Sequence, residues 1–400
     1  MGTDRNLQAP SQRLKIGLVH RFDARDVRSW SGTLYFMAQA LQRHVGDVVY
    51  LGPDNSKATE RTSKVIWKLN GLIRKFGAPD LVSDHNRILS KRLGSFFREQ
   101  MRGQKIDILF APAASIEIAY LESDVPLVYF SDITWNDIID YYPEYSGFRP
   151  IARREGENIE ARAIRQAKAV VYPSAWPGKS AHEHYHAHEE DIFEIPFGAN
   201  LQEPPSREAA LAHRLGPELE LLWVGVDWNR KGGATAFECF RELLDSGVNV
   251  RLTSCGCIPP KEFEHPKFRV IPFLNKHDPE QRRQLSELFL GAHFFLFPTR
   301  ADATPLVIAE ASAHGLPCLT TATGGIGGHL KEGKNGYMLP PGADGRAYAS
   351  KIMSLLQEPE AYRALVRESR ELFETRLNWD AWGNSMREVF SFVLGKEKAR

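Results

Sequence analysis

Two series of short apolar runs, each interleaved with longer helical patterns, constrain the fold of this chain most strongly. The first series places candidate strands at residues 14–19, 48–51, 106–110, 127–130, 169–172 and 192–195. The second places them at 221–224, 250–254, 268–271, 293–297 and 317–320. Strands that alternate with helices pair in parallel, because each helix returns the chain to the same end of the sheet. We therefore predict an α/β protein with two parallel sheets.

The length of the chain suits two domains. A chain of 400 residues can form two hydrophobic cores. The polar, proline-bearing segment 197–217 lies between the two strand series and is typical of a linker. We predict a first domain over residues 1–198, a second over 199–378 and a separate C-terminal helix over 379–400.

Overall composition excludes some classes of protein. Lys and Arg number 51 against 50 Asp and Glu, so charge does not indicate a nucleic-acid binder. No apolar run reaches the roughly 18 residues of a transmembrane helix, and residues 1–13 lack the apolar core of a signal peptide. We expect a cytoplasmic protein. The four cysteines show no metal-binding spacing and are expected to be reduced core residues: Cys239, Cys255, Cys257 and Cys318.

One local segment departs from this charge balance. Residues 61–105 contain eleven Lys or Arg and three acids. Within that segment, one helical stripe gathers the apolar residues Val65, Leu69, Leu72 and Phe76, with lysines beside it. The pattern fits a helix at the surface of an anionic membrane. It also fits a surface helix that packs on its own domain.

The segment 300–328 carries the strongest indication of function. Thr304 is a candidate N-cap and Pro305 suits the first helical position, so we predict a helix from here to about His314. Gly315 and Pro317 are expected to end it.

Two acids belong to this segment, one before the predicted helix and one within it. Asp302 precedes the helix, and Glu310 lies among small apolar residues that are typical of a buried position. A buried glutamate requires hydrogen bonds, either from a cation or from the hydroxyls of a ligand. The start of the helix is also a favourable site for an anion. Phosphate at the helix start and hydroxyls at both acids together predict a bound sugar nucleotide.

Three loops of the second strand series are expected to converge on one crevice. Ligands of such sheets bind at the carboxyl ends of the strands. The loop 225–233 contains Arg230 and Lys231, two cations suited to a diphosphate. The loop 298–302 brings Asp302, and the loop 322–328 contains Gly324 and Gly325, whose amides can face phosphate.

The chain resembles a known family, the retaining family 4 glycosyltransferases of the GT-B fold. The resemblance is strongest over residues 221–340. It rests on an acid followed after seven residues by Glu310, on Gly315-Leu316-Pro317, on Gly324-Gly325 and on Asn335-Gly336. Further upstream, residues 172–176 and 195–200 resemble the family's end of the first domain. The resemblance implies two facing Rossmann-like domains with a central cleft, and a C-terminal helix, beginning near Trp379, that crosses back to the first domain.

The resemblance also implies a role for each site residue. The first domain would bind the acceptor and the second the nucleotide-sugar donor. Glu310 would accept hydrogen bonds from ribose hydroxyls, and Asp302 would hold hydroxyls of the sugar. The amides of Thr304 and Leu306 would lie near the β-phosphate. Arg230 and Lys231 would stabilise the departing diphosphate, so that neither a metal nor another cofactor is expected.

Three departures from the family pattern stand out. Asp302 replaces a commoner glutamate, and Val226 stands where many members carry an arginine. Many members also have a histidine beside the reacting centre, where this chain has Ser131-Asp132. Asp132 or Thr134 is expected to take the place of that histidine on the acceptor side, and Asp132 is our candidate for a catalytic residue.

Two further motifs have more than one interpretation. Ser31-Gly32-Thr33 resembles the family's glycine loop, in which Gly32 faces the donor across the cleft, or it is an ordinary helix start. The histidines at positions 182, 184, 186 and 188 form pairs four residues apart, which on a helix can chelate a metal. They also fit a surface helix, and we predict no metal site.

We therefore predict a hexosyltransferase of polysaccharide biosynthesis that moves a sugar to a glycan or a lipid-linked acceptor. It would be cytoplasmic, and peripheral at an anionic membrane if segment 61–105 binds one. The alternatives are a catalytically degenerate nucleotide-sugar-binding protein, a phosphorylase or epimerase of the same fold, and a two-domain ligand-binding protein of the periplasmic kind.

Overall fold

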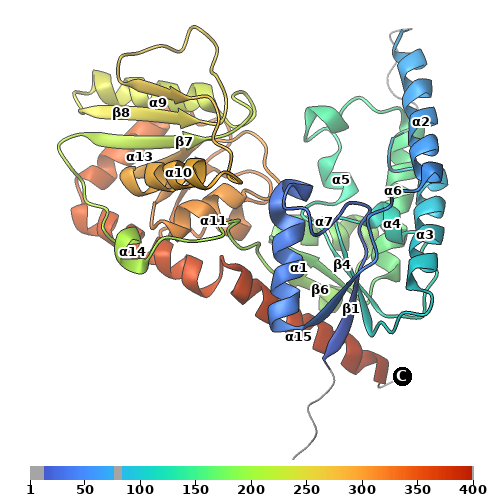
Figure 1. The fold of residues 1–400 in the computed structure, drawn as a ribbon. Helices are drawn as coiled ribbons and strands as arrows, with labels where there is room; N and C mark the ends of the chain where they lie inside the picture. Colours follow the sequence, from blue (N-terminus) through green and yellow to red (C-terminus); the bar gives the residue numbers. More distant parts are fainter. Residues whose placement is uncertain (1–12, 76–82, 399–400) are drawn as a thin grey trace, which may run out of the picture.

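The computed structural model describes residues 13–75 and 83–398 and consists of two lobes side by side (Figure 1). Each lobe is built on a parallel six-stranded sheet. The first sheet has the order β2-β1-β3-β4-β5-β6 and the second the order β12-β11-β10-β7-β8-β9. The predicted GT-B architecture of two Rossmann-like lobes is confirmed. The domain boundary at 198/199 stays a prediction, and it falls between the two sheets.

The strands follow the two predicted series, with one addition. Those of the first sheet are β1 Leu14–Leu18, β2 Gly46–Tyr50, β3 Ile108–Pro112, β4 Leu127–Phe130, β5 Ala169–Tyr172 and β6 Ile192–Glu194. Those of the second are β7 Leu219–Val224, β8 Val250–Cys255, β9 Phe268–Ile271, β10 Phe294–Phe297, β11 Cys318–Thr321 and β12 Gly336–Leu339. The sequence analysis missed β12, because it is a short edge strand that begins at a glycine and carries only a weak apolar signal.

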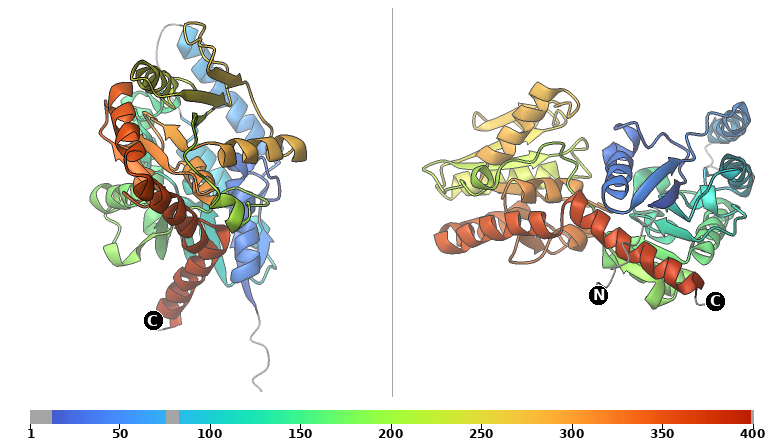
Figure 2. Two further views of the ribbon diagram at one scale, coloured as in Figure 1. Left: turned by 90° about the vertical axis from the view of Figure 1, so that its left-hand side faces the viewer. Right: turned by 60° about the horizontal axis from the view of Figure 1, so that its bottom comes forward.

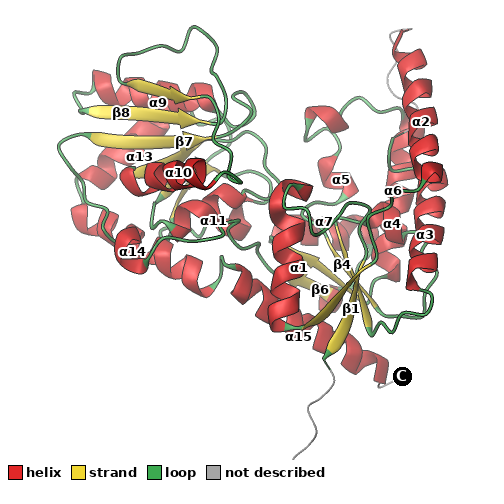
Figure 3. Ribbon diagram, in the orientation of Figure 1, coloured by secondary structure: helices red, strands yellow, loops and turns green. Residues whose placement is uncertain are grey.

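Helices cover both faces of each sheet (Figure 3). The first lobe contains η1 Ser29–Gly32, α1 Thr33–His44, α2 Lys57–Lys75, α3 Arg87–Met101, α4 Ser115–Ile118, α5 Trp135–Ile138, η2 Pro143–Tyr145, α6 Pro150–Gln166, α7 Ala175–Tyr185 and η3 Glu189–Asp191. The second contains α8 Arg207–Ala210, α9 Gly233–Asp245, α10 Pro279–Gly291, α11 Leu306–Ala313, α12 Ile326–His329, α13 Gly345–Leu356 and α14 Pro359–Thr375. Central strands such as β3 and β10 are buried along their whole length, which explains their unbroken apolar sequences.

The last helix, α15 Trp379–Lys398, crosses from the second lobe to the first (Figure 2). Its side chains Trp382, Met386 and Phe390 belong to the same buried cluster as strands β1, β3 and β4. The predicted crossing helix is therefore confirmed. Where the linking chain passes it, a Cβ on Gly198 would lie 2.5 Å from the Trp379 nitrogen, so the two segments can approach only because residue 198 lacks a side chain.

The amphipathic helix predicted near residues 64–76 is α2, and it stands at the outer edge of the first lobe (Figure 1). Its apolar side chains are exposed rather than packed: Val65 by 65%, Trp67 by 72%, Leu69 by 40% and Leu72 by 56%. Phe76, which completed the predicted stripe, lies outside the described residues. Among the residues that the structure describes, no helix is long and apolar enough to span a bilayer.

Candidate active site

Two of the three predicted loops, 225–233 and 298–302, meet at the carboxyl edge of the second sheet and line a cavity of about 300 Å³, the donor cavity, whereas its described lining includes no residue of the third predicted loop, 322–328. The loops after β7 and β8 contribute Lys231 and Gly256, and the segment after β10 contributes Asp302 and Thr304. Glu310 lines the same cavity from α11. Ser31 and Asn200 line its opposite wall. The cavity therefore lies in the cleft between the lobes.

The start of α11 differs from the prediction. The helix begins at Leu306 with Pro305 as its N-cap, and no side chain caps it. Thr304 is therefore not the N-cap, and its buried hydroxyl oxygen has no hydrogen-bond partner within the described part of the chain. The Leu306 amide donates to the Thr304 carbonyl at 3.0 Å, so this predicted phosphate donor is already in use. Thr304 lines the donor cavity, but its hydroxyl oxygen is itself buried.

Asp302 and Lys231 form a buried ion pair at the bottom of the donor cavity. The Lys231 ammonium contacts the Asp302 carboxylate, and their side chains are 14% and 8% exposed. Burial lowers the pKa of Lys231, and the charge of Asp302 opposes that shift. Gly232 allows this contact, because its φ is +71° and a Cβ there would lie 1.8 Å from the Pro298 carbonyl oxygen. The β7 and β10 loops thus bring the cation to the acid.

Arg230 does not line the donor cavity. Its guanidinium donates to the Ala301 carbonyl at 3.1 Å and lies 5.3 Å from the ring centre of Tyr142 in the first lobe. Of the two predicted diphosphate cations, only Lys231 faces the cavity. Lys231 contacts the Asp302 carboxylate within the cavity, whereas Arg230 contacts the Ala301 carbonyl and the Tyr142 ring.

Glu310 is buried as predicted, but its partner is a cation of the chain itself. The Lys276 ammonium lies 2.5 Å from Glu310 Oε1 and 2.7 Å from Oε2. The Glu310 side chain is 3% exposed and that of Lys276 is 42% exposed. Lys276 can therefore leave the carboxylate for solvent while Glu310 cannot move away. The sequence analysis missed Lys276, which lies in the loop before α10.

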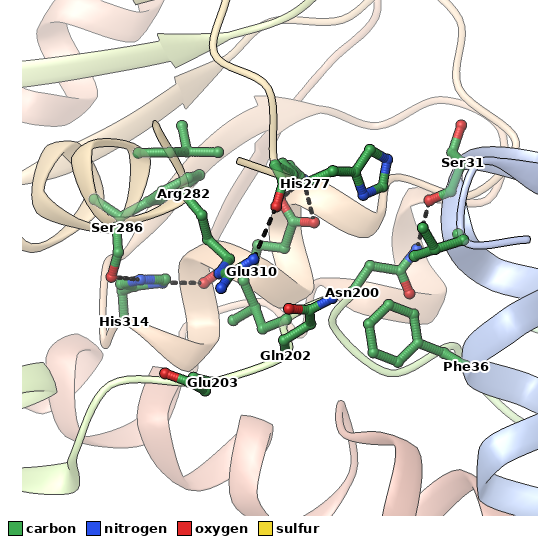
Figure 4. A pocket seen from close by; sticks show the side chains of 16 residues that line it. Ser31, Phe36, Asn200, Gln202, Glu203, His277, Arg282, Ser286, Glu310 and His314 are labelled. Carbon is green, nitrogen blue, oxygen red and sulfur yellow. Dashed lines mark hydrogen bonds and ion pairs between the residues drawn. The ribbon is translucent and has the colours of Figure 1, made fainter. Parts of the chain in front are cut away.

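Glu310 also borders a smaller, second cavity, shown in Figure 4. Ser31 and Phe36 of the first lobe lie on one side of it, and Ser286 and His314 of the second lobe lie on the other. His314 Nδ1 donates to the Glu310 carbonyl at 2.7 Å, and the Ser286 hydroxyl lies 2.9 Å from Nε2. Burial lowers the pKa of His314 to about 4, so the ring is neutral and orients α11 without adding charge.

Gly32 and the glycine pair of the β11 loop serve close packing. Gly32 is the N-cap of α1 and lines the second cavity across from Glu310. The Gly325 amide donates to the Asp302 carbonyl at 3.1 Å, so it does not face a ligand as predicted. Gly324 has a φ of +50°, and a Cβ there would lie 2.2 Å from the Tyr141 hydroxyl. The pair lets the β11 loop and the first lobe approach the Asp302 segment.

Two tyrosines of the first lobe, which the sequence analysis missed, connect the lobes at this point. The Asp302 amide donates to the Tyr141 hydroxyl at 2.9 Å, and the Ala303 amide donates to the Tyr142 hydroxyl at 2.7 Å. Burial is the main cause that raises the pKa of both tyrosines. The tyrosines lie between α5 and η2, in irregular chain that gave no motif. They hold the acid segment of the second lobe against the first.

Asp132 lies in a separate cavity of about 240 Å³ in the first lobe, the acceptor cavity. Glu160 of α6, Tyr129 of β4 and Tyr142 also line it. Burial raises the pKa of Asp132 to about 6, and the charge of Asp302 adds to this shift. Ala303 of the second lobe closes the cavity. The donor and acceptor cavities therefore meet on either side of the segment 302–304.

The histidine segment does not form the predicted helical pairs. Helix α7 ends at Tyr185, and His186 caps it with a φ of +57°, so only His182 and His184 lie in the helix. Within the described ranges, no three His, Cys, Asp or Glu side chains come together as a metal site. Three of the four cysteines are buried and Cys257 is partly buried, and all are free thiols.

Comparison with known proteins gives matches in sequence and in structure. Residues 218–358 match the sequence model of the family Glycosyl transferases group 1. The D-inositol 3-phosphate glycosyltransferase of Nocardiopsis dassonvillei is 25% identical over 258 residues, which cover 60% of this chain and 59% of that relative. The match thus spans somewhat over half of the relative's length.

Solved structures match over nearly the whole chain. The sucrose-phosphate synthase of Thermosynechococcus elongatus has a TM-score of 0.63 at 16% identity, covering 96% of this chain and all of that one. Anabaena Alr3699/HepE in complex with UDP and glucose has a TM-score of 0.61 at 15% identity, covering 95% of this chain and all of that one. At these identities the likeness shows the fold. Together with the matched sequence segment, it supports the predicted class, a glycosyltransferase of the GT-B fold.

Proposed function

We propose that this protein is a retaining glycosyltransferase of family 4 that transfers a hexose from a nucleoside-diphosphate sugar to a hydroxyl of a glycan or a lipid-linked acceptor. One observation carries the proposal. The donor cavity, with Lys231, Asp302 and Glu310, meets the acceptor cavity, with Asp132, at the segment 302–304. A transferase requires such an arrangement, because donor carbon and acceptor hydroxyl must come into direct contact.

The donor fits the cavity in one orientation. Ribose hydroxyls would replace the Lys276 ammonium on Glu310 and fill the acceptor sites of that carboxylate when Lys276 moves to solvent. The diphosphate would lie against the Lys231 ammonium and the unpartnered Thr304 hydroxyl. Phe273 is 61% exposed at the rim of the cavity and offers a face for the base. Asp302 would then meet the hydroxyls of the sugar.

The chemistry follows from these positions. The bond between the anomeric carbon and the β-phosphate oxygen breaks, and the acceptor oxygen bonds to that carbon from the same face. The acceptor proton passes to the leaving phosphate or to Asp132. Lys231 stabilises the charge that develops on the diphosphate, so the step requires neither a metal nor another cofactor. Arg230, held by Ala301 and Tyr142, positions the segment that carries Asp302.

A nucleotide-binding measurement tests the proposal. UDP, GDP, ADP and their glucose or mannose conjugates are added to the purified protein, and its thermal unfolding is followed. UDP and UDP-glucose come first, because the Anabaena neighbour was solved with UDP and glucose. One of the nucleotides should raise the midpoint of unfolding, and Glu310→Ala should remove the effect. If no nucleotide raises it, the proposal fails.

A degenerate transferase is the second candidate, because Val226 replaces an arginine and Arg230 faces away from the donor cavity. Such a protein would bind the donor without turnover. Release of free nucleotide from the donor separates the two. Slow donor hydrolysis that is lost in Glu310→Ala supports the active transferase, and tight binding without any hydrolysis or transfer supports the degenerate one.

We further propose that α2 docks on an anionic membrane, which would make the cytoplasmic protein peripheral. The exposed side chains Val65, Leu69 and Leu72 lie along one face of a helix that also carries Lys64 and Lys68. An exposed apolar stripe beside lysines suits the boundary of an anionic bilayer. Vesicles with phosphatidylglycerol should carry the protein in flotation, and Leu72→Glu should abolish this.

The matched control for that experiment is Ile88→Glu. Ile88 is 70% exposed but lies on α3, outside the α2 stripe, so this variant should still float. No flotation of the unaltered protein at low salt overturns membrane docking and leaves the transferase proposal unaffected.

A further inference from the structure

The acceptor cavity has a chemical composition that bears on what it binds. Two carboxyl side chains line it, from Asp132 and Glu160, together with hydroxyl groups of Ser115, Ser131, Thr134, Tyr129, Tyr142 and Tyr145. Trp30 adds an aromatic surface. No lysine or arginine appears among the described residues of this lining. The donor cavity, in contrast, contains Lys231 and Lys276.

The two carboxyls differ from the other buried acids of the cleft in lacking an ion pair. Asp302 and Glu310 each contact a lysine. Glu160 accepts a hydrogen bond from the Tyr129 hydroxyl at 3.0 Å, and the described residues offer no cation to Glu160 or Asp132 within ion-pair distance. Burial raises the pKa of Glu160 to about 7, as it raises that of Asp132. Near neutral pH Glu160 is thus divided between acid and carboxylate and Asp132 is mainly the carboxylate, and either form bonds hydroxyls.

We propose that this cavity binds an uncharged, hydroxyl-rich ring, a sugar without phosphate, and that Asp132 and Glu160 bond its hydroxyls. This inference rests on the proposed function, because it takes the cavity as the acceptor side of a transferase. A phosphate here would lose its hydration and meet two acids without a compensating cation, which is strongly unfavourable. Hydroxyls instead match a lining that both donates and accepts hydrogen bonds.

The size of the cavity agrees with a single ring. Its volume of about 240 Å³ lies below the roughly 300 Å³ at which pockets for drug-sized ligands begin, so it suits one ring better than a chain of rings. A ring hydroxyl near Ala303 would stand next to Asp302 and hence next to the donor sugar. The basic segment 61–105 then has a separate role. Anionic groups of an acceptor, if present, bind outside this cavity, and the reacting ring itself is uncharged.

Binding of three small probes tests the inference without a donor. Methyl α-glucoside, glucosamine and glucose 6-phosphate are compared by saturation-transfer NMR with titration. Methyl α-glucoside should bind at least tenfold more tightly than glucose 6-phosphate. Asp132→Asn and Glu160→Gln should each weaken it severalfold. Glu144→Gln, which changes an exposed carboxylate of η2 beside the cavity, should not.

A second variant keeps the test valid if Glu160→Gln fails to fold. Ile138→Arg adds a cation to the lining of the cavity and leaves both acids in place. It should reduce the difference in affinity between methyl α-glucoside and glucose 6-phosphate. Equal binding of glucose 6-phosphate and methyl α-glucoside, tighter binding of glucosamine, or no binding of either sugar would each overturn the inference.

Parallel titration with UDP separates this inference from the proposed function. If UDP stabilises the protein but glucose 6-phosphate binds as tightly as methyl α-glucoside, only the inference is wrong. If the uncharged sugar binds as expected while no nucleotide does, the inference about the cavity stands and the transferase proposal fails.

Discussion

The two lobes share one architecture and differ in the charge of their cavities. Both sheets are parallel, six-stranded and covered by helices. At the donor cavity each buried acid has a lysine partner, whereas at the acceptor cavity the buried Glu160 and the half-buried Asp132 have none among the described residues. The acids of both cavities lie in loops and helices, but the two lysines that separate the cavities lie in loops, after β7 and before α10. The fold therefore fixes where ligands bind, and the loops decide which charge they carry.

The same contrast appears in the comparison with known proteins. The matched family segment, residues 218–358, covers the donor lobe and none of the first sheet. The family match therefore bears on the donor side, and the acceptor lobe lies outside it.

Removal of the donor-side cation should have the largest effect. Lys231→Met leaves the Asp302 carboxylate buried without its cation, so we expect a loss of about 3 to 5 kcal/mol in the free energy of unfolding. Urea denaturation measures it. The double variant Lys231→Met/Asp302→Asn should recover most of the loss, because it removes the unpaired charge. If Lys231→Met leaves the free energy of unfolding almost unchanged, the donor side does not contain a buried, charged pair.

The acceptor side should respond in the opposite direction. The pKa of Asp132 is raised from 3.8 to about 6, so the folded protein holds this proton more tightly and loses stability as the pH rises from about 4 to above 6. Asp132→Asn should thus stabilise the protein by up to about 3 kcal/mol at pH 8 and have little effect at pH 3.5.

Urea denaturation at the two pH values measures this difference, with Asp124→Asn as the matched control. Asp124 is exposed in the turn before β4, so its replacement should have no pH-dependent effect. If Asp132→Asn destabilises the protein at pH 8, its carboxylate is held by interactions that we have not identified, and the contrast between the cavities fails.

Glu310 and Lys276 should have opposite effects on nucleotide binding. Glu310→Gln removes charged hydrogen bonds to ribose, each worth about 1.5 to 3 kcal/mol, so UDP affinity should fall roughly 10- to 100-fold. Lys276→Met removes the competitor for the carboxylate, and affinity should stay the same or rise. Isothermal titration with UDP measures both. An equal loss in the two variants would mean that Lys276 contacts the nucleotide itself.

The smallest effect should come from the contacts that join the lobes. Tyr142→Phe removes the hydrogen bond from the Ala303 amide. We expect this loss to reduce the free energy that holds the two lobes together by about 0.5 to 1.5 kcal/mol. Small-angle scattering should show a larger radius of gyration for the double variant Tyr141→Phe/Tyr142→Phe. Tyr50→Phe on β2 serves as the control and should scatter like the unaltered protein. Unchanged scattering in the double variant would show that other contacts keep the cleft closed.

The sequence predicted the strands and the position of both acids, because these depend on local periodicity and on chain direction at strand ends. Glu310 was predicted to be buried and bonded, and it is, but Lys276 could not be identified as its partner. That pairing depends on how the loop before α10 folds back over α11. Tyr141 and Tyr142 were missed for the same reason, since contacts between lobes leave no periodic pattern.

The prediction of Thr304 as the N-cap of α11, which rested on local sequence preference alone, was wrong. Thr304-Pro305 has the composition of an N-cap followed by a first helical residue, yet the turn formed by the Leu306 amide on the Thr304 carbonyl delays the helix. A site that keeps a hydroxyl unbonded for a ligand gives up the interaction that local propensity favours.

The crossing helix also affects the order in which the two lobes can fold. The ribosome completes every strand of the first sheet before it begins the second, but the core of the first lobe lacks Trp382, Met386 and Phe390 until α15 has been synthesised. During synthesis the donor lobe can therefore reach its native core first. The first lobe keeps an exposed apolar surface until α15 has been synthesised. Nascent chains stopped before residue 379 should accordingly protect the second sheet from protease and leave the first one sensitive.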